Sequence, residues 1–259
     1  MPSLPPLTSS PTRYPGCCFE LSEPLLATIK TLLDAAPHLT NQSQDGYRPA
    51  LGSEPALILS VGSGTGLLEK LLDDYLNNGN HAQPNLPSAR KWRVEGVEVN
   101  PAVNIYLPED RINHVPGTWA VLETRAREAA VLVFVYPRHG ALVRRYIDTF
   151  LTSSTRAGDG HEASRETGSA NEDRDGGATR SSSEALKYGN HGEDGNEVPR
   201  NPCKGVQLVL WLGPKCDWDD TGLASFYTDH EFEVLEMRHD AGLAEYEMLA
   251  ALRRKSTSM

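Results

Sequence analysis

Three glycines at alternate positions form the most informative pattern in this chain of 259 residues. Gly62, Gly64 and Gly66 stand in the run GSGTG, between the apolar run ALILSV and leucines at helical spacing. Glycine lets a chain turn tightly and lets a ligand come close to the backbone. The N-terminus of the helix that follows offers unpaired N–H groups and a partial positive charge, which favour a carboxylate or a phosphate. The pattern predicts a strand, a ligand-binding turn and a helix.

A carboxylate lies near the end of the next predicted strand. The run RVEGVEV spans residues 93–99 and contains Glu98 as its last acid. A carboxylate there can accept hydrogen bonds from both ribose hydroxyls of a nucleoside. If a nucleoside binds at the glycine turn, we expect Glu98 to hold its ribose. Glu95 is a competing candidate, and a solvated acid at a strand end would give the same pattern.

Predicted strands and helices alternate along the chain, which is typical of a parallel sheet covered by helices on both faces. Strands are expected at 56–61, 93–99, around 112–115, 130–137 and 206–212. Helices are expected at 22–36, after the glycine turn, and at 121–129, 141–151 and 220–228. Two last strands, 231–239 and 244–254, would add an antiparallel hairpin at one edge. The order predicts a doubly wound α/β fold.

Glycine spacing separates two classes of ligand. In the dinucleotide fingerprint G-x-G-x-x-G the third glycine follows three positions after the second, whereas Gly66 follows Gly64 at two. The run VGSGTGLLE resembles motif I of the class I S-adenosylmethionine-dependent methyltransferases. The resemblance covers roughly residues 56–151 and 203–254. It implies a Rossmann-like, seven-stranded, mostly parallel sheet with a C-terminal antiparallel hairpin, and S-adenosyl-L-methionine as cofactor.

The resemblance also implies which residues bind the cofactor. They are Ser60, Gly62, Ser63, Gly64, Thr65, Gly66, Glu98 and Thr118. The glycine turn would shape the pocket for the methionine part. Ser60 stands where the family usually has Asp or Glu, so it brings no charge to oppose the sulfonium or the amino group. Thr118 falls where the family contacts adenine, while we expect its neighbour Trp119 to pack in the core.

Residues that handle the methyl acceptor often follow the fourth strand in this family. Here Tyr136 and Arg138 are the candidates for catalytic residues, in the run FVYPR, which only partly resembles the Asn/Asp-Pro-Pro-Tyr/Phe motif of amino-group methyltransferases. A strand-end turn with Arg138 in solvent would explain the same residues. Methyl transfer depends mainly on in-line positioning of the acceptor, so a missing general base does not exclude it. Residues 217–222 (DWDDTG) either border the acceptor site or begin a helix.

Composition divides the chain into parts. Residues 1–20 contain five Pro and predict a flexible N-terminal arm. Residues 21–254 form the methyltransferase-like domain, and 255–259 a tail. The domain is interrupted by residues 152–202, of which only eight are hydrophobic, so we expect a disordered polar insert there.

Charge and cysteine content limit the partners and the compartment. The net charge of −10 argues against a nucleic-acid partner, because phosphate contacts need clustered Lys and Arg. The sequence shows no membrane span, secretory signal or metal-ligand spacing, and we expect its four cysteines to be reduced, in the cytoplasm or the nucleus. We expect methyl transfer to a protein or a small molecule. A catalytically inactive interaction module and an NAD(P)-dependent oxidoreductase are the alternatives.

Overall fold

The structure of the protein is a computed structural model. It describes residues 2–36, 55–78, 91–137, 139–155, 205–221, 223 and 232–255. Within these ranges, no helix combines the length and the apolar character that crossing a membrane requires.

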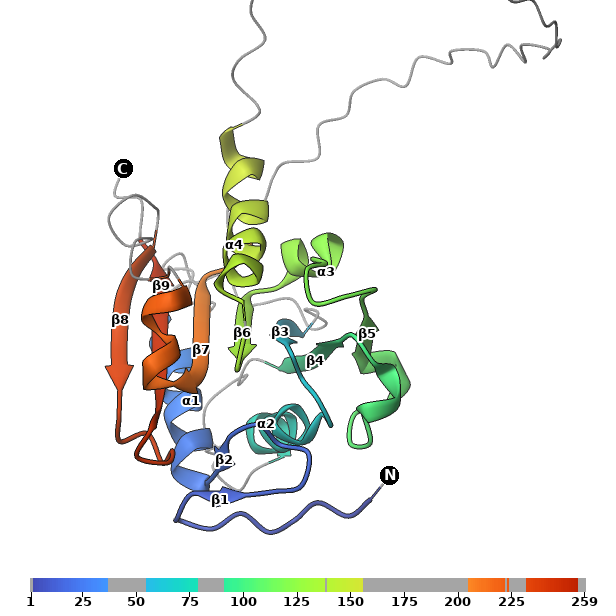
Figure 1. The fold of residues 1–259 in the computed structure, drawn as a ribbon, viewed down its shortest axis with the longest axis vertical. Helices are drawn as coiled ribbons and strands as arrows, with labels where there is room; N and C mark the ends of the chain where they lie inside the picture. Colours follow the sequence, from blue (N-terminus) through green and yellow to red (C-terminus); the bar gives the residue numbers. More distant parts are fainter. Residues whose placement is uncertain are drawn as a thin grey trace, which may run out of the picture.

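A seven-stranded sheet runs through the middle of the molecule (Figure 1). In spatial order its strands are β5 (Ile112–His114), β4 (Trp92–Glu98), β3 (Ala56–Val61), β6 (Val131–Val135), β7 (Leu208–Pro214), β9 (Glu247–Arg254) and β8 (Phe232–Arg238). The first five are parallel, whereas β9 lies between β7 and β8 and is antiparallel to both. The predicted fold class, with its C-terminal hairpin, is confirmed.

The chain order of the strands fixes where a ligand can bind. From β3 the chain proceeds to β4 and β5 on one side, and β6 then returns to the other side of β3. The topological switch point therefore lies between β3 and β6. In sheets of this kind, ligands bind outside the carboxyl ends of the strands at that point.

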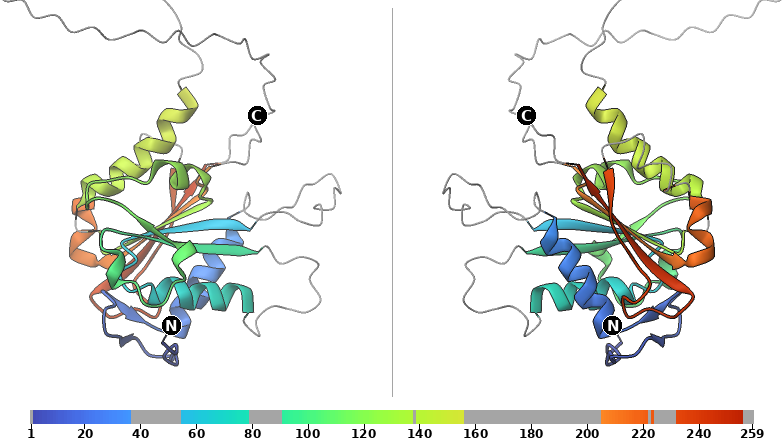
Figure 2. Two further views of the ribbon diagram at one scale, coloured as in Figure 1. Left: turned by 90° about the vertical axis from the view of Figure 1, so that its right-hand side faces the viewer. Right: turned by 90° about the vertical axis from the view of Figure 1, so that its left-hand side faces the viewer.

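Helices cover both faces of the sheet (Figure 2). Helices α1 (Glu23–Ala35) and α2 (Leu67–Asn78) lie on one face, and α3 (Glu123–Glu128) and α4 (Gly140–Thr155) lie on the other. Side chains alternate along β3: Ile58 packs with α1 and α2, while Leu57 and Leu59 pack with α3 and α4. Because both faces are covered, every residue of β3 is buried.

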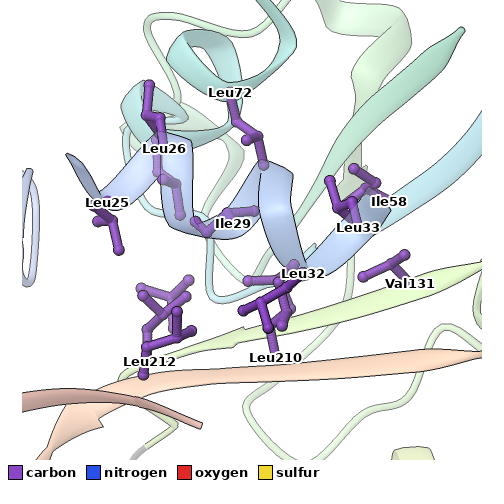
Figure 3. Packing of buried hydrophobic residues seen from close by; sticks show 14 of the residues in the cluster. Leu25, Leu26, Ile29, Leu32, Leu33, Ile58, Leu72, Val131, Leu210 and Leu212 are labelled. Atoms are coloured by element: carbon purple, nitrogen blue, oxygen red, sulfur yellow. The ribbon is translucent and has the colours of Figure 1, made fainter. Parts of the chain in front are cut away.

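Helix α1 follows the expected pattern. The Ser22 hydroxyl accepts a hydrogen bond from Leu25 N at 3.2 Å and caps the helix, and Pro24 stands in its first turn. Its buried side chains face Ile58, Val131, Leu210 and Leu212 of the sheet, as Figure 3 shows. They are Leu25, Leu26, Ile29, Leu32 and Leu33.

Short 3₁₀ helices fill the connections. They are η1 (Pro101–Val103), η2 (Glu109–Arg111), η3 (Lys215–Asp217) and η4 (Asp219–Thr221). The predicted helix 220–228 begins inside η4, and its residues from 224 on lie outside the described ranges. Helix α4 extends to Thr155, so the first four residues assigned to the polar insert are helical. The remainder of the insert also lies outside the described ranges.

The N-terminal segment differs from the flexible arm that we predicted for residues 1–20. Strands β1 (Thr12–Arg13) and β2 (Glu20–Leu21) pair with each other, and Phe19 is only 1% exposed. Leu4, Leu7 and Tyr14 also pack against the core that α1 and α2 share. The apolar residues between the prolines therefore attach this segment to the domain.

Candidate functional site

The glycine loop, residues 62–66, joins β3 to α2 at the switch point. Gly62, Gly64 and Gly66 have φ angles of +85°, +54° and +79°, a region that residues with a Cβ rarely adopt. A Cβ on Gly62 would lie 3.0 Å from the Val135 carbonyl oxygen at the end of β6. Glycine therefore allows both the turn and the close approach of the loop to β6.

Backbone hydrogen bonds hold the loop in place. Gly62 N and Ser63 N donate to the Val97 carbonyl of β4 at 3.0 and 3.3 Å. Gly66 N donates to Ser63 O, and Lys70 N donates to Gly66 O, which begins the helical pattern of α2, both at 3.0 Å. The loop is thus fixed to β4 on one side and to α2 on the other.

The segment after β4 packs against the same loop. Ile105 N and Tyr106 N donate to the Thr65 carbonyl at 3.0 and 3.1 Å. A Cβ on Gly66 would lie 2.5 Å from Asn104 Oδ1, which itself accepts from Leu107 N at 3.0 Å. This contact explains the third glycine, because any larger residue would displace Asn104.

Glu98 faces the glycine loop from the end of β4. Its Oε2 accepts a hydrogen bond from Gly64 N at 2.9 Å, and its Oε1 accepts from Val99 N at 2.8 Å. Asn100 N also donates to Oε1, at 3.4 Å. A carboxylate has about four acceptor sites, so this partly buried side chain can accept from a hydroxyl as well.

Glu95, the competing candidate, is already engaged. Its side chain is buried and accepts hydrogen bonds from Arg93, from Arg125 and, at 3.0 Å, from Asn113. Burial raises the pKa of this carboxyl, but the hydrogen bonds from Arg125, Arg93 and Asn113 outweigh burial and hold the pKa below its usual value. Glu95 therefore connects β4 to its neighbours, and Glu98 alone of the two faces the loop.

Ser60 has a partner that the sequence did not indicate. Its hydroxyl, buried in β3, donates to Glu69 Oε1 at 2.6 Å. Glu69 lies in the first turn of α2 and is 1% exposed. Burial raises the pKa of Glu69 to about 7, although the Ser60 hydrogen bond acts in the opposite direction. In the sequence, only the presence of an acid within the leucine-rich start of a helix could have indicated that Glu69 is buried.

Unpartnered polar atoms gather at the loop. Among the residues that the structure describes, Ser63 Oγ, Thr65 Oγ1 and Glu69 Oε2 are buried without a hydrogen-bond partner. Buried polar atoms are normally hydrogen-bonded, so such a group needs an explanation. Three of them between positions 63 and 69 favour a polar ligand at this place.

The N-terminal segment lies across the loop. A Cβ on Gly16 would come within 2.4 Å of Thr65 Cγ2, and the Gly16 carbonyl oxygen lies 3.5 Å from where a Cβ on Gly64 would stand. Burial, together with the nearby charge of Glu69, raises the pKa of the Cys17 thiol to about 12. The thiol therefore stays protonated and adds no charge near the loop.

Tyr136, a predicted candidate, follows β6 in a strained conformation with φ of +46°, and it alone of the described non-glycine residues has a positive φ. Its hydroxyl donates to Glu247 Oε1 at 2.5 Å, and its ring stacks on Phe19 with centroids 6.4 Å apart. Burial, followed by the contact with Glu247, raises the pKa of Tyr136. Arg138, the second candidate, lies outside the described residues.

Glu247 is a further residue that the sequence did not indicate. It is completely buried in β9 and also accepts hydrogen bonds from Glu20 N and Ala244 N, both at 3.3 Å. Arg13 lies 3.9 Å from its Oε1. This carboxylate therefore joins Tyr136 to the N-terminal segment.

A cleft of about 190 Å³ opens beyond β6 and β7. Its lining consists of Pro137, Gly140, Asp217, Asp220 and Thr221. The run that we expected to border an acceptor site or to begin a helix thus lies at the carboxyl end of the sheet, in 3₁₀ turns. In the described ranges, no group of three or more His, Cys, Asp or Glu side chains is placed to hold a metal ion.

Thr118 lies in the turn after β5 and is exposed. The same connection reaches Glu98, because Val115 N donates to the Glu98 carbonyl at 3.2 Å. Trp119 is 62% exposed, so the expectation that it packs in the core was wrong. Its ring lies over Gly117, where a Cβ would be 1.8 Å from the ring, and this contact turns it outward.

The strand order, the glycine loop after β3 and the acid at the end of β4 define a Rossmann-like fold. No family model matches the sequence, and no curated protein matches it. Solved structures do match. One is a candidate tRNA (m1A22) methyltransferase from Streptococcus pneumoniae in complex with S-adenosyl-L-methionine, at 12% identity over 90% of this chain and 74% of that chain, with a TM-score of 0.39.

Two further structures are similar to this chain. A 23S rRNA methyltransferase matches at 14% identity, over 88% of this chain and 68% of that chain, with a TM-score of 0.33. A precorrin-6y C5,15-methyltransferase from Geobacter metallireducens matches at 11% identity, over 94% and 100%, with a TM-score of 0.40. Two of the three are named as RNA methyltransferases, so the argument from net charge against a nucleic-acid partner is corrected.

Proposed function

We propose that the protein binds S-adenosyl-L-methionine at the glycine loop and transfers its methyl group to an acceptor. One observation carries the proposal: the Glu98 carboxylate is hydrogen-bonded to Gly64 N, at 2.9 Å, at the switch point of the sheet. This contact places a carboxylate that can accept hydrogen bonds from ribose hydroxyls next to a turn that a ligand can approach closely.

The residues around the loop fit this cofactor. The N-terminus of α2 offers N–H groups to the carboxylate of the methionine part. Ser63 Oγ and Thr65 Oγ1 are buried polar atoms for which no partner is found in the described part of the chain, and Glu98 has acceptor sites left for the ribose. Thr118, in the turn next to Glu98, would border the adenine. These are the residues that we propose as the binding site.

The chain contributes mainly the positioning of the reactants. When bound, the cofactor supplies a methyl group activated by its sulfonium, so the protein needs mainly to align an acceptor with it. The N-terminal segment contacts the loop, because Gly16 lies against Thr65. The Tyr136 hydroxyl donates a hydrogen bond to Glu247 and has a raised pKa, so we assign it to holding this segment and not to proton abstraction.

The cleft beyond β6 and β7 is where we propose that the acceptor enters. It follows Tyr136 directly and lies at the carboxyl end of the sheet, the edge at which ligands of this fold bind. Asp217 and Asp220 make it polar and negatively charged, which favours an acceptor that donates hydrogen bonds there.

Calorimetry with S-adenosylhomocysteine tests the cofactor proposal. We expect the wild-type protein to bind it, and Glu98→Gln to weaken binding at least about 10-fold, because a hydrogen bond to a charged group contributes about 1.5–3 kcal/mol. Glu123→Gln, the same change at an exposed residue of α3, is the control and should bind as the wild type does. A folded wild-type protein that does not bind at millimolar concentration, or that NAD(P) protects from unfolding instead, would overturn the proposal.

A further inference from the structure

We propose that Glu69 binds the α-ammonium group of S-adenosylmethionine, an inference that rests on the proposed function. The methyltransferases that this sequence resembles usually carry an acid at the position of Ser60. Here the Ser60 hydroxyl is 2.6 Å from Glu69 Oε1, so a carboxylate from α2 stands next to the place where the strand lacks one. The missing charge is supplied by another element.

Glu69 has a free acceptor at the right place. It is 1% exposed and uses one carboxylate oxygen for Ser60, whereas the other oxygen is buried without a partner among the described residues. The N-terminus of α2 attracts the carboxylate of the methionine part. The ammonium group is bonded to the same carbon as that carboxylate, so a residue in the first turn of α2 can reach it.

The charges around Glu69 favour a cationic ligand. Glu98 of β4 is negative, Cys17 of the N-terminal segment is a protonated thiol, and Ser60 of β3 is neutral. None of the ion pairs found in the described ranges includes Glu69. A buried carboxylate is stable as an anion only with a counter-charge. The ammonium group would provide it.

Proton release should accompany binding. Burial raises the pKa of Glu69 to about 7, so the free protein holds this proton below neutral pH. An ammonium group favours the ionised form and lowers that pKa, which ties ligand affinity to pH. For the wild type we expect affinity for S-adenosylhomocysteine to rise between pH 5.5 and 7.5, while the affinity of Glu69→Gln should change little.

Two ligands separate this role from a structural one. S-adenosylhomocysteine carries the ammonium group, whereas 5′-methylthioadenosine keeps the adenosine part and lacks the amino acid end. By calorimetry at pH 7.5, Glu69→Gln should weaken binding of the first at least about 10-fold and leave that of the second within about twofold. Glu123→Gln serves again as the matched control, and circular dichroism verifies folding of each variant.

The possible results are distinct. If the wild type binds neither ligand, the proposed function fails, and the role of Glu69 fails with it. If the wild type binds both ligands and Glu69→Gln binds S-adenosylhomocysteine equally well, only the role of Glu69 is overturned. Equal weakening for both ligands also overturns it, because that result would mean that the substitution disturbs the loop as a whole.

Discussion

Three glutamates near the glycine loop show how the neighbours of a carboxylate decide its properties. Glu95 is bonded to Arg93 and Arg125, and its pKa lies below the usual value. Glu69 is bonded to one hydroxyl, and burial raises its pKa to about 7. Glu98 accepts hydrogen bonds from backbone amides at the edge of the loop. The same residue type thus connects neighbouring elements at Glu95, stays protonated up to about neutral pH at Glu69 and faces the proposed ligand site at Glu98.

The raised pKa of Glu69 predicts a dependence of stability on pH. Because the folded state binds this proton more tightly than the unfolded state, the contribution is fully present below pH 4.5 and is lost as the pH rises to about 7. The loss corresponds to about 3 kcal/mol. Glu69→Gln has no carboxyl to titrate and does not lose this contribution. In urea unfolding, the free energy of unfolding of the variant relative to that of the wild type should therefore rise by that amount from pH 4.5 to 7.5. A constant difference between the two proteins would contradict the prediction.

At the scale of the element, the conformation of the glycine loop is fixed by contacts with its neighbours. Val97 O of β4 accepts its first amides, Val135 O of β6 lies next to Gly62, and the segment after β4 donates to Thr65 O. Contacts from three directions leave one conformation for the loop. Each glycine should therefore be sensitive to substitution to a different degree, according to the space beside it.

Gly66→Ala and Gly64→Ala form a matched pair. Both introduce a Cβ at positive φ, which is unfavourable by about 1–2 kcal/mol. At Gly66 the new atom would also lie 2.5 Å from Asn104 Oδ1, whereas at Gly64 the nearest atom is 3.5 Å away. We expect urea unfolding to show a loss of about 3 kcal/mol or more for Gly66→Ala and a smaller loss for Gly64→Ala. Equal losses would mean that Asn104 moves aside freely.

At the scale of the whole molecule, the N-terminal segment contacts the start of β9, which is distant in sequence. Arg13 donates to the Tyr246 hydroxyl, and Glu247 of β9 accepts from Glu20 N. Phe19 of the same segment stacks on Tyr136. The N-terminal segment is thus part of the folded domain and also contacts the glycine loop at Gly16.

Phe19→Ala tests whether the N-terminal segment contributes to the stability of the domain. Removal of a buried phenylalanine side chain usually destabilises a protein by about 3–5 kcal/mol. We expect a loss in that range by urea unfolding, although Phe19 lies outside the seven-stranded sheet. Ser9→Ala, at an exposed position of the same segment, should stay within about 0.5 kcal/mol of the wild type. A similarly small effect for Phe19→Ala would show that the segment detaches without consequence for the domain.

Local patterns in the sequence were sufficient for the sheet and its helices. Strand β3 was predicted as residues 56–61, as observed, because a buried parallel strand is continuously apolar. The packing of the N-terminal segment was missed because its apolar residues are spaced by prolines and follow no period. Glu247 was missed because its partner Tyr136 lies 111 residues away, and sequence alone does not show such a contact.

The contact between the N-terminal segment and β9 also affects how the protein is made. Glu247, which accepts a hydrogen bond from the Glu20 backbone amide, is synthesised 227 residues after Glu20. Strand β9, which contains Glu247, also separates β7 from β8. A nascent chain that lacks this strand can therefore neither complete its sheet nor form the contact between Glu247 and the N-terminal segment.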